Sequence, residues 1–298
     1  MRLNSNPNGE WDKNNVIPIT YYIDCYGGTY IGEQSINSPQ RIKRGEVFEV
    51  PVGQYLDSPH DATCNIYGSK MIQSLRNLAE VYPSYISFGS SGKLRALDLG
   101  SDKAGYYNAE LYSFSIGANT MLQEVNIQNV GKIPATANMS LNLDYLYALE
   151  KLKLTGSSFT TLSLADGGVL EELHLNSLDT LRMYNLLNLT HDKIFLNNKE
   201  MDEDGNVFDL TVLGSDATAE EIKNQKIRQY RYTASKLATI NIENCPGMNY
   251  HGYKLLHYAP REYFTEYSLK DISWEVDDIN ELVIEDGKVK SLKILDKL

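Results

Sequence analysis

The sequence predicts an α+β fold that is mostly β, with short strands stacked in coils and two strands in each coil. The unit Φ-x-x-Φ-x-Φ, in which Φ is apolar, occurs four times between Leu149 and Asn185. Its fourth and sixth places face the same side of an extended chain, so each unit brings one short apolar strand to a shared core. One unit cannot bury this face alone, whereas a stack of units can. The repeat therefore predicts a solenoid.

The copies of the unit fall into two alternating series. The first series starts at positions 94, 122, 149 and 170, and the second at 111, 138, 159 and 178. The spacings are 28, 27 and 21 residues in the first series and 27, 21 and 19 in the second, so both shorten together. This is expected when one coil carries two strands. An amphipathic helix would instead repeat apolar residues at i, i+3, i+4 and i+7, whereas Leu-x-Leu alternation dominates here.

Two sets of residues should mark the inside of the coils and their turns. Residues at the fourth and sixth places should be buried: Leu152, Leu154, Leu162, Leu164, Leu173, Leu175, Leu181 and Met183. Amides that closely follow strands can bond the turning backbone that the strand ladder leaves unpaired. These are Asn129, Asn176, Asn185 and Asn244.

The repeats resemble those of leucine-rich repeat proteins. The resemblance rests on LRALDLG, LQEVNIQN, LEKLKLT, LEELHLN and LATINIENCPG, and it covers residues 94–190 and 237–248. The chain departs from the family because it lacks a fixed period and a long helix in each repeat. The resemblance therefore implies an irregular leucine-rich-repeat-type solenoid rather than a smooth horseshoe.

A narrower resemblance links the chain to the tail structural (muzzle) proteins of crAss-like gut bacteriophages. It rests on the lead-in SKMIQSLRNLAEVYP, the irregular repeats FTTLSLADGGVLEELHL and the segment NIENCPG. This resemblance implies a virion tail as the location of the protein. Related irregular repeats also occur on surface proteins of gut bacteria, which would imply the cell surface instead.

The regions beside the repeats predict a three-part organisation, with parts at 1–68, 69–248 and 249–298. Residues 16–56 alternate in the manner of strands and predict an N-terminal β unit. The last part reads as an irregular tyrosine-rich segment that ends in a hairpin through Asp286-Gly287.

A capping helix is predicted at the start of the middle part. Ser69 is a suitable N-cap, Pro83 follows the end, and apolar residues such as Met71 and Leu75 recur on one helical face. This helix would cover the open end of the first coil, because a terminal coil otherwise exposes its apolar interior.

Residues 197–236 interrupt the repeat and are interpreted as an insertion. Asp204-Gly205 is a good hairpin turn between two short extended runs. Thr218, with Glu221 three places further on, forms a capping box that should begin a helix.

The charge balance and hydropathy argue against two classes of partner. Lys and Arg number 28 against 39 Asp and Glu, which gives a net charge of −11. A nucleic-acid groove needs clustered cations, so nucleic-acid binding is not expected. No run of 18 apolar residues occurs, so no membrane span is expected either.

The sequence offers no catalytic, cofactor-binding or metal-binding residues that could be named together. The carboxylates around Asp202 and Asp204 suggest a calcium loop, but the later bidentate Glu is missing and the glycine is misplaced. A plain turn is favoured there. The five histidines have no metal-ligand spacing, and the three cysteines are too scattered for a zinc site or a disulfide framework. We therefore expect no enzyme, no metal and no cofactor.

Tyrosine is the unusual residue, with 21 copies. Its ring can be buried while its hydroxyl stays wet, which suits subunit interfaces, packing at the edges of a thin core and, less favoured here, sugar stacking. Edge packing and subunit contact are equally suitable roles for these tyrosines. The interface residues that we predict are Tyr106, Tyr107, Tyr253 and Tyr258, with His174 and Arg182 at outward strand positions.

These observations predict a non-enzymatic structural or interaction protein that binds other protein subunits of a larger assembly. The resemblance would make it a component or fragment of a bacteriophage tail protein in the virion. The alternative is a bacterial cell-surface adhesin or receptor that binds a host protein or, less favoured, a glycan. Recognition faces are rich in aromatic and Arg anchors. Only Arg182 is of this kind among the outward strand residues Asp98, Ser115, Asn126, Lys153, Ser163, His174 and Arg182, which favours the assembly role.

Overall fold

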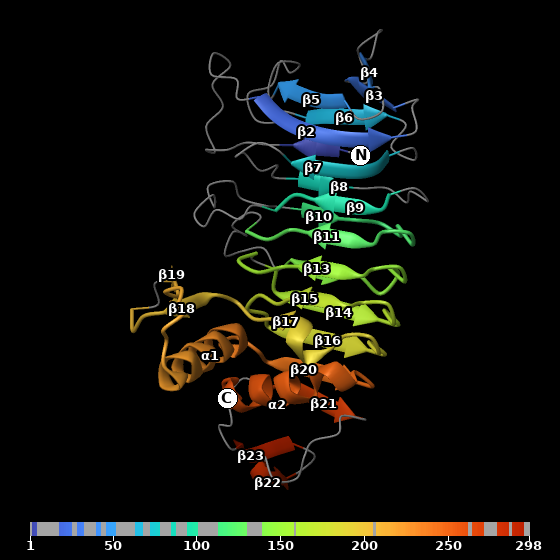
Figure 1. Ribbon diagram of the computed structural model, residues 1–298. Coiled ribbons are helices and arrows are strands. Elements are labelled where there is room, and N and C mark those ends of the chain that lie inside the picture. The colour runs from blue at the N-terminus through green and yellow to red at the C-terminus, as the bar shows by residue number, and fades with distance from the viewer. Residues whose placement is uncertain are drawn as a thin grey trace. The chain divides into compact units, whose positions relative to one another are not determined.

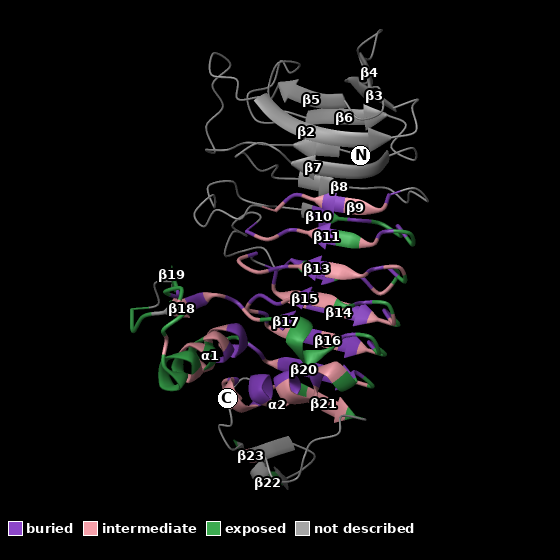
Figure 2. Cartoon of the chain, viewed as in Figure 1, coloured by how far each residue is buried: buried purple, intermediate pink, exposed green. Residues whose placement is uncertain are grey.

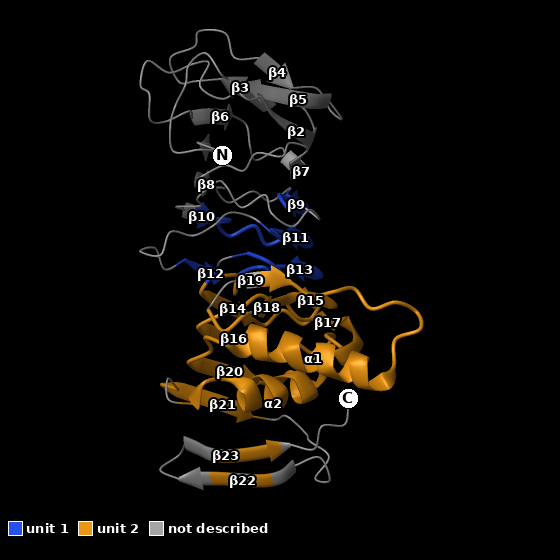
Figure 3. Ribbon diagram, turned by 90° about the vertical axis from the view of Figure 1, so that its left-hand side faces the viewer, with its two compact units in different colours: residues 1–141, 145–159 blue, residues 142–144, 160–298 orange. Residues whose placement is uncertain are grey.

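The computed structural model forms two compact units, which Figure 3 distinguishes by colour. The first unit contains residues 1–141 and 145–159, and the second contains 142–144 and 160–298. The structure describes residues 2–4, 18–25, 29–32, 40–42, 46–51, 63–67, 72–77, 85–87, 94–100, 113–129, 139–157, 159–204, 207–261, 264–270, 279–285 and 288–294. Over these residues the fold is α+β and mostly β, with parallel sheets and two α-helices, as predicted (Figure 1).

The first unit contains two sheets. One has the order β10-β8-β1-β6-β3-β4, and the other runs β13-β11-β9-β7-β2-β5 within this unit. The strands are β1 (Arg2–Asn4), β2 (Pro18–Cys25), β3 (Thr29–Gly32), β4 (Gln40–Ile42), β5 (Glu46–Pro51), β6 (Thr63–Tyr67), β7 (Ile72–Asn77), β8 (Tyr85–Ser87), β9 (Ala96–Asp98), β10 (Ser113–Ser115), β11 (Glu124–Asn126) and β13 (Lys151–Lys153). β12 (Ser140–Asn142) crosses the division between the units.

Strands of the first series pair in parallel within the first unit. Leu97 of β9 lies opposite Val125 of β11, and Val125 lies opposite Leu152 of β13. These three residues occupy the fourth place of their units and are at most 1% exposed. The register of the sheet therefore follows the register of the repeat. The predicted N-terminal β unit is likewise composed of strands, since β2 pairs antiparallel with β5, and β3 with β4.

The predicted capping helix is wrong. Residues 72–77 form strand β7, which pairs antiparallel with β2 and in parallel with β9. Leu75 lies opposite Leu97, so Ile72, Leu75 and Asn77 occupy the first, fourth and sixth places of one more repeat unit. The apolar pattern of this unit is incomplete in the sequence, because the polar Asn77 occupies its sixth place. The remaining apolar residues fit a helical face equally well, and pairing with strands on both sides decides the outcome.

The second unit contains a parallel sheet of order β14-β16-β20-β21 and a parallel pair, β15 with β17. Consecutive strands from β14 to β17 alternate between the two, as the two series predict. The elements are β14 (Thr161–Ala165), β15 (Glu172–His174), β16 (Thr180–Tyr184), η2 (His191–Lys193), β17 (Ile194–Phe195), β18 (Lys199–Met201), β19 (Val207–Asp209), α1 (Ala219–Ala234), β20 (Thr239–Glu243), η3 (Pro246–Met248), α2 (Asn249–Tyr258), β21 (Glu266–Lys270), β22 (Ile279–Glu285) and β23 (Lys288–Ile294).

All eight residues predicted to face inward are buried. Each is at most 3% exposed, and buried residues alternate with partly exposed ones along β13, β14, β15 and β16 (Figure 2). In the second unit, Leu162 of β14 aligns with Leu181 of β16, which aligns in turn with Ile240 of β20. Stacking of like positions on neighbouring strands closes each apolar face, which one three- to five-residue strand could not do alone.

The turns after β14, β16 and β20 share one conformation and one hydrogen-bond pattern. Asp166, Asn185 and Asn244 have φ values of 54°, 56° and 52°, in the left-handed region that Asn and Asp tolerate best after glycine. The backbone N–H of each donates to the next strand segment, reaching the carbonyls of Tyr184, Glu243 and Lys270 at 3.0–3.1 Å. We call Asp166, Asn185 and Asn244 the turn ladder.

The side chains of the turn ladder are also joined. Asn244 Nδ2 donates to Asn185 Oδ1 at 2.9 Å, and Asn185 Nδ2 donates to Asp166 Oδ1 at 2.6 Å. The side-chain amides of Asn185 and Asn244 therefore bond other side chains, whereas bonds to the turning backbone were predicted; of the four predicted amides, such a bond is confirmed for Asn176. Asn129 also has a positive φ, of 55°, whereas Asn176 is buried and its amide donates to the Ser177 carbonyl.

The segment 197–236 forms the hairpin and helix that its turn chemistry predicts. β18 and β19 pair antiparallel, with Met201 opposite Val207, around Asp204; Gly205 lies outside the described residues. α1 begins after Thr218, whose hydroxyl accepts from the Glu221 N–H while the Glu221 carboxylate accepts from the Thr218 N–H. The C-terminal hairpin is also confirmed, because β22 pairs antiparallel with β23, although Asp286-Gly287 lies outside the described residues.

The expectation of an irregular tyrosine-rich segment after residue 248 is wrong, because residues 249–258 form α2. Gly252 and the many Tyr and His residues give this segment a weak helical propensity, so the sequence favours no helix. Packing compensates for that weakness, since His251, Gly252, Lys254, Leu255 and Leu256 are all buried.

Truncation of one inward leucine tests this packing. Leu173 is 0% exposed, and Leu173→Ala should lower the free energy of unfolding by about 2–5 kcal/mol, because it leaves a cavity that the sheet cannot close. Chemical denaturation measures the loss. Leu187, 54% exposed in the same unit, is the matched control, and Leu187→Ala should change stability by less than about 0.5 kcal/mol.

Substitution of Asn185 separates the conformation of the turn ladder from its side-chain bonds. Asn185→Ala should lower the free energy of unfolding by about 1–2 kcal/mol, since alanine is strained at positive φ and cannot make the amide bonds. Asn185→Gly should lower it by less, because glycine adopts this φ without strain. Equal losses in thermal or chemical unfolding for the two variants would show that the left-handed φ contributes nothing.

Candidate interaction surfaces

Outward polar side chains in the first unit bond to one another along the sheet. Asn126 Nδ2 donates to Asp98 Oδ1 at 2.9 Å, and Lys151 lies 3.5 Å from the Glu124 carboxylate. Gly100 makes room for the first of these bonds, because a Cβ at this position would lie 2.3 Å from Asn126 Oδ1. The outward row of this sheet is therefore a set of cross-strand pairs rather than a set of open polar groups.

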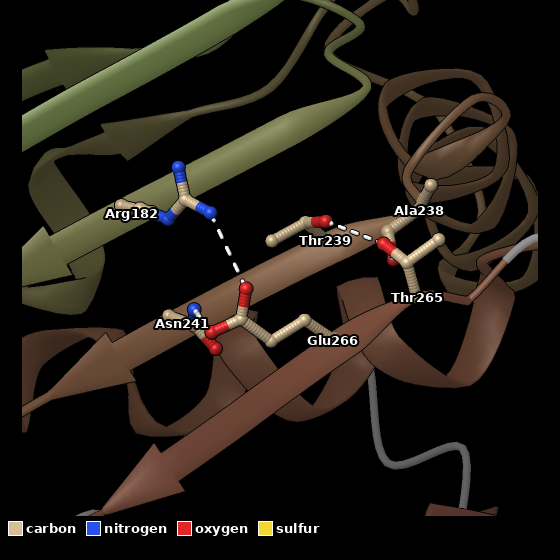
Figure 4. A network of polar contacts seen from close by, with 6 residues as sticks. All are labelled: Arg182, Ala238, Thr239, Asn241, Thr265 and Glu266. Carbon is tan, nitrogen blue, oxygen red and sulfur yellow. Dashed lines mark hydrogen bonds and ion pairs between the residues drawn. The ribbon is translucent and has the colours of Figure 1, made fainter.

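A denser network covers the outward side of β16, β20 and β21 in the second unit (Figure 4). The Glu266 carboxylate accepts from Asn241 Nδ2 at 2.7 Å and from Arg182 Nη2 at 3.3 Å. Hydrogen bonds from Asn241 and then Arg182 hold the pKa of Glu266 below its usual value. Arg182, a predicted interface residue, thus lies within the protein's own network, with its side chain 41% exposed.

The network explains why two outward residues of β20 are buried. Asn241 is 3% exposed and Thr239 is 7% exposed. Asn241 lies beneath the bond between Arg182 and Glu266, and the Thr239 hydroxyl is 2.9 Å from that of Thr265 (Figure 4). Polar side chains thus form a second layer over the sheet. This layer bonds the outward polar side chains of three strands to one another.

His174 is placed at the outward position that the repeat predicts, but it is partly covered. Its ring stacks on Phe195 with centroids 4.4 Å apart, and its Nε2 is 3.0 Å from the Glu172 carboxylate. Phe195 is 41% exposed and lies opposite His174 on β17. Phe195 was not predicted from the sequence because the repeat is degenerate there. The available signal was Ile194, which aligns with Leu173.

The predicted tyrosines fall into two groups. Tyr106 and Tyr107 lie outside the described residues. Tyr253 and Tyr258 are on α2 and are half-buried. The Tyr258 ring stacks on that of Tyr230 from α1, with centroids 6.2 Å apart, and Arg231 lies 5.7 Å from the Tyr258 ring centroid. Tyr258 therefore contributes to packing between the two helices.

A buried hydrogen-bonded chain joins α1, α2 and η2. Tyr230 OH is 2.8 Å from His251 Nδ1, and His251 Nε2 is 3.0 Å from the carbonyl of His191. A carbonyl only accepts, so His251 carries its proton on Nε2 and its Nδ1 accepts from the tyrosine hydroxyl. Burial lowers the pKa of His251 to about 4, so this ring is neutral at pH 7.

The buried hydrogen bonds of His251 should make the free energy of unfolding depend on pH. In the unfolded chain His251 binds a proton near the ordinary histidine pKa of 6.5, whereas in the folded protein it does so only near pH 4. The stabilisation that depends on neutral His251 is therefore fully present above pH 6.5 and is lost as the pH falls towards 4. Over this range the free energy of unfolding should change by at most about 1.4 kcal/mol per pH unit.

His251→Gln should flatten this slope, because glutamine does not titrate but can still donate to the His191 carbonyl. The measurement is chemical denaturation at a series of pH values between about 7 and 5, the range in which an unfolded histidine gains its proton. His191→Gln is the comparison variant, because it keeps the backbone carbonyl that His251 bonds and removes only the charge of the exposed His191 ring. That charge lowers the pKa of His251 less than burial does, so this variant should keep most of the slope. If His251→Gln keeps the slope of the unchanged protein, His251 is not its source.

The described residues contain neither a metal-binding cluster nor a membrane-spanning helix. No group of three or more His, Cys, Asp or Glu side chains in this part of the chain is arranged to hold a metal ion. No helix within the described ranges combines the length and the apolar character needed to cross a membrane.

The chain was compared with protein families, with individual curated proteins and with solved structures. No protein family, curated protein or solved structure matches it.

Proposed function

We propose that this chain is an irregular leucine-rich-repeat-type solenoid that serves as a non-enzymatic structural component of a larger protein assembly. The observation that carries the proposal is the mutual bonding of outward strand residues. Asp98 with Asn126, and Arg182 with Asn241 and Glu266, bond to neighbouring strands of their own unit. Such cross-strand bonds stiffen a sheet and engage its outward side chains with one another.

The repeat supports the same proposal. Leucines of successive strands align and are buried, and the turn ladder joins three consecutive turns through backbone and side-chain bonds. Rigid stacking of this kind suits a spacer or scaffold, since its energy comes from contacts between neighbouring repeats. The resemblance to bacteriophage tail proteins makes a virion tail the proposed assembly.

A second candidate is a cell-surface receptor or adhesin, and one observation favours it. Phe195 presents a partly exposed ring, supported on its other side by His174, with Glu172 close by. An aromatic ring beside a carboxylate can stack on a sugar and accept from its hydroxyl groups. This pair is the location that we propose for a glycan in that case.

A glycan array and a pull-down with the purified chain separate the two functions. The assembly role predicts capture of protein subunits and no specific glycan signal. The receptor role predicts micromolar glycan binding that Phe195→Ala abolishes and that Tyr147→Ala leaves unchanged, since Tyr147 is another exposed aromatic residue. Glycan binding with this dependence would overturn the assembly role.

A further inference from the structure

Three exposed apolar side chains gather on the segment 197–236. Phe208 of β19 is 46% exposed, Val212 is 84% exposed and Ile222 of α1 is 42% exposed. Exposed apolar residues scattered singly need no explanation, but a contiguous group of them indicates a contact surface. Whether these three form one surface depends on how α1 meets the hairpin.

Two polar bonds place them along the line where α1 meets the hairpin. Gln225 Nε2 of α1 donates to the Thr211 carbonyl at 3.1 Å, next to Val212. Arg228 Nε lies 3.4 Å from the Glu200 carboxylate, and Glu200 is directly opposite Phe208 across the hairpin. Ile222 and Gln225 are neighbours on the surface of α1, as are Gln225 and Arg228, because each pair is three residues apart. The three apolar residues therefore border one seam, which Figure 1 shows between α1 and the β18–β19 hairpin.

The two sides of this seam carry opposite charge. The hairpin, residues 199–209, contains five acidic residues and one basic residue, Lys199, which pairs with Asp209. Residues 219–236 contain five basic residues and two acidic ones, both in the first turn of α1. Glu203 and Asp204 at the hairpin end are exposed, as are Lys226 on α1 and Lys236 just beyond it. The basic side is unusual in a chain with a net charge of −11.

We propose that this seam is a docking surface for a second copy of this chain. A two-fold contact uses the same patch on both partners and so requires a patch that complements itself. Here the acidic hairpin of one copy faces the basic half of α1 in the other, and Phe208, Val212 and Ile222 of both copies form the apolar centre. An apolar centre with a charged rim is the usual anatomy of a protein interface.

Charge also argues for a second copy over an unrelated acidic protein. A purely basic patch would suit any acidic partner, but the acidic hairpin beside it would repel such a partner. A second copy offers both signs in the required arrangement. This inference rests on the proposed assembly role and adds one named contact to it.

Exchange of charges tests the proposal with the full chain. Glu203→Lys with Asp204→Lys makes the hairpin end basic, and Lys226→Glu with Lys236→Glu makes the α1 side more acidic. Each double variant should be monomeric by sedimentation equilibrium at micromolar concentrations where the unchanged chain is dimeric, and an equimolar mixture of the two should form a heterodimer. Glu171→Lys, an exposed change outside the segment, should leave the dimer intact.

Val212→Asp provides a variant with little risk of misfolding, because this side chain makes so little contact within its own chain. It should weaken dimerisation at least tenfold, while circular dichroism and thermal unfolding stay unchanged. The proposal is overturned if the unchanged chain is monomeric, if the two double variants dimerise normally, or if their mixture fails to associate. A monomeric chain that still captures other subunits in the pull-down would refute this surface and leave the assembly role standing.

Discussion

Burial of the inward leucines depends on a neighbour, and this dependence governs the structure of both units. A strand of three to five residues has only one or two inward side chains, which cannot enclose themselves. Leu152 is covered because Val125 lies beside it on β11, and Leu181 because Leu162 and Ile240 lie on either side. The inward side chains of each repeat therefore cover those of the next repeat. A polar substitution at one inward place affects both neighbours as well as its own strand.

Irregular spacing of the repeats is compatible with this packing because the turns are fixed separately. In the second unit, Asp166, Asn185 and Asn244 adopt the same left-handed φ at the same point after their strands. Each backbone N–H bonds the following strand segment, whatever the length of chain between them. In the turn ladder, Asn244 donates to Asn185 and Asn185 donates to Asp166. The series ends at Asp166 because a carboxylate only accepts. Leucines and turn residues thus hold the register while the connecting segments vary.

The sequence predicted the parts of the fold that depend on local pattern. The buried leucines, the capping box at Thr218 and the two hairpins follow from spacing and turn chemistry alone. Two errors arose where tertiary contacts outweigh local preference. Asn77 interrupts the apolar pattern of β7, whose identity is fixed by the strands on either side. Gly252 weakens α2, which instead depends on burial against the rest of its unit.

The interaction residues were harder to predict than the core, because a sequence shows which residues face outward but not what covers them. Arg182 and His174 do occupy outward positions, yet Glu266 from a strand 84 residues away and Phe195 from a degenerate repeat partly cover them. Tyr258 is engaged by Tyr230 of the inserted helix. The partners of Arg182 and Tyr258 lie on other elements far along the chain, so no local pattern could reveal them, whereas Ile194 was the available signal for Phe195.

The same reasoning explains why the segment 197–236 matters for contacts with other proteins. Residues within the repeat have neighbours on both sides that use their polar groups. The inserted hairpin and helix lie outside that series, so their outer side chains have no adjacent repeat to bond. Evolution can therefore change the charge and apolar content of this segment without disturbing the buried leucines. The most exposed large apolar side chain on the described surface, Val212, lies in this segment, as expected if the repeat supplies rigidity and the insertion supplies specificity.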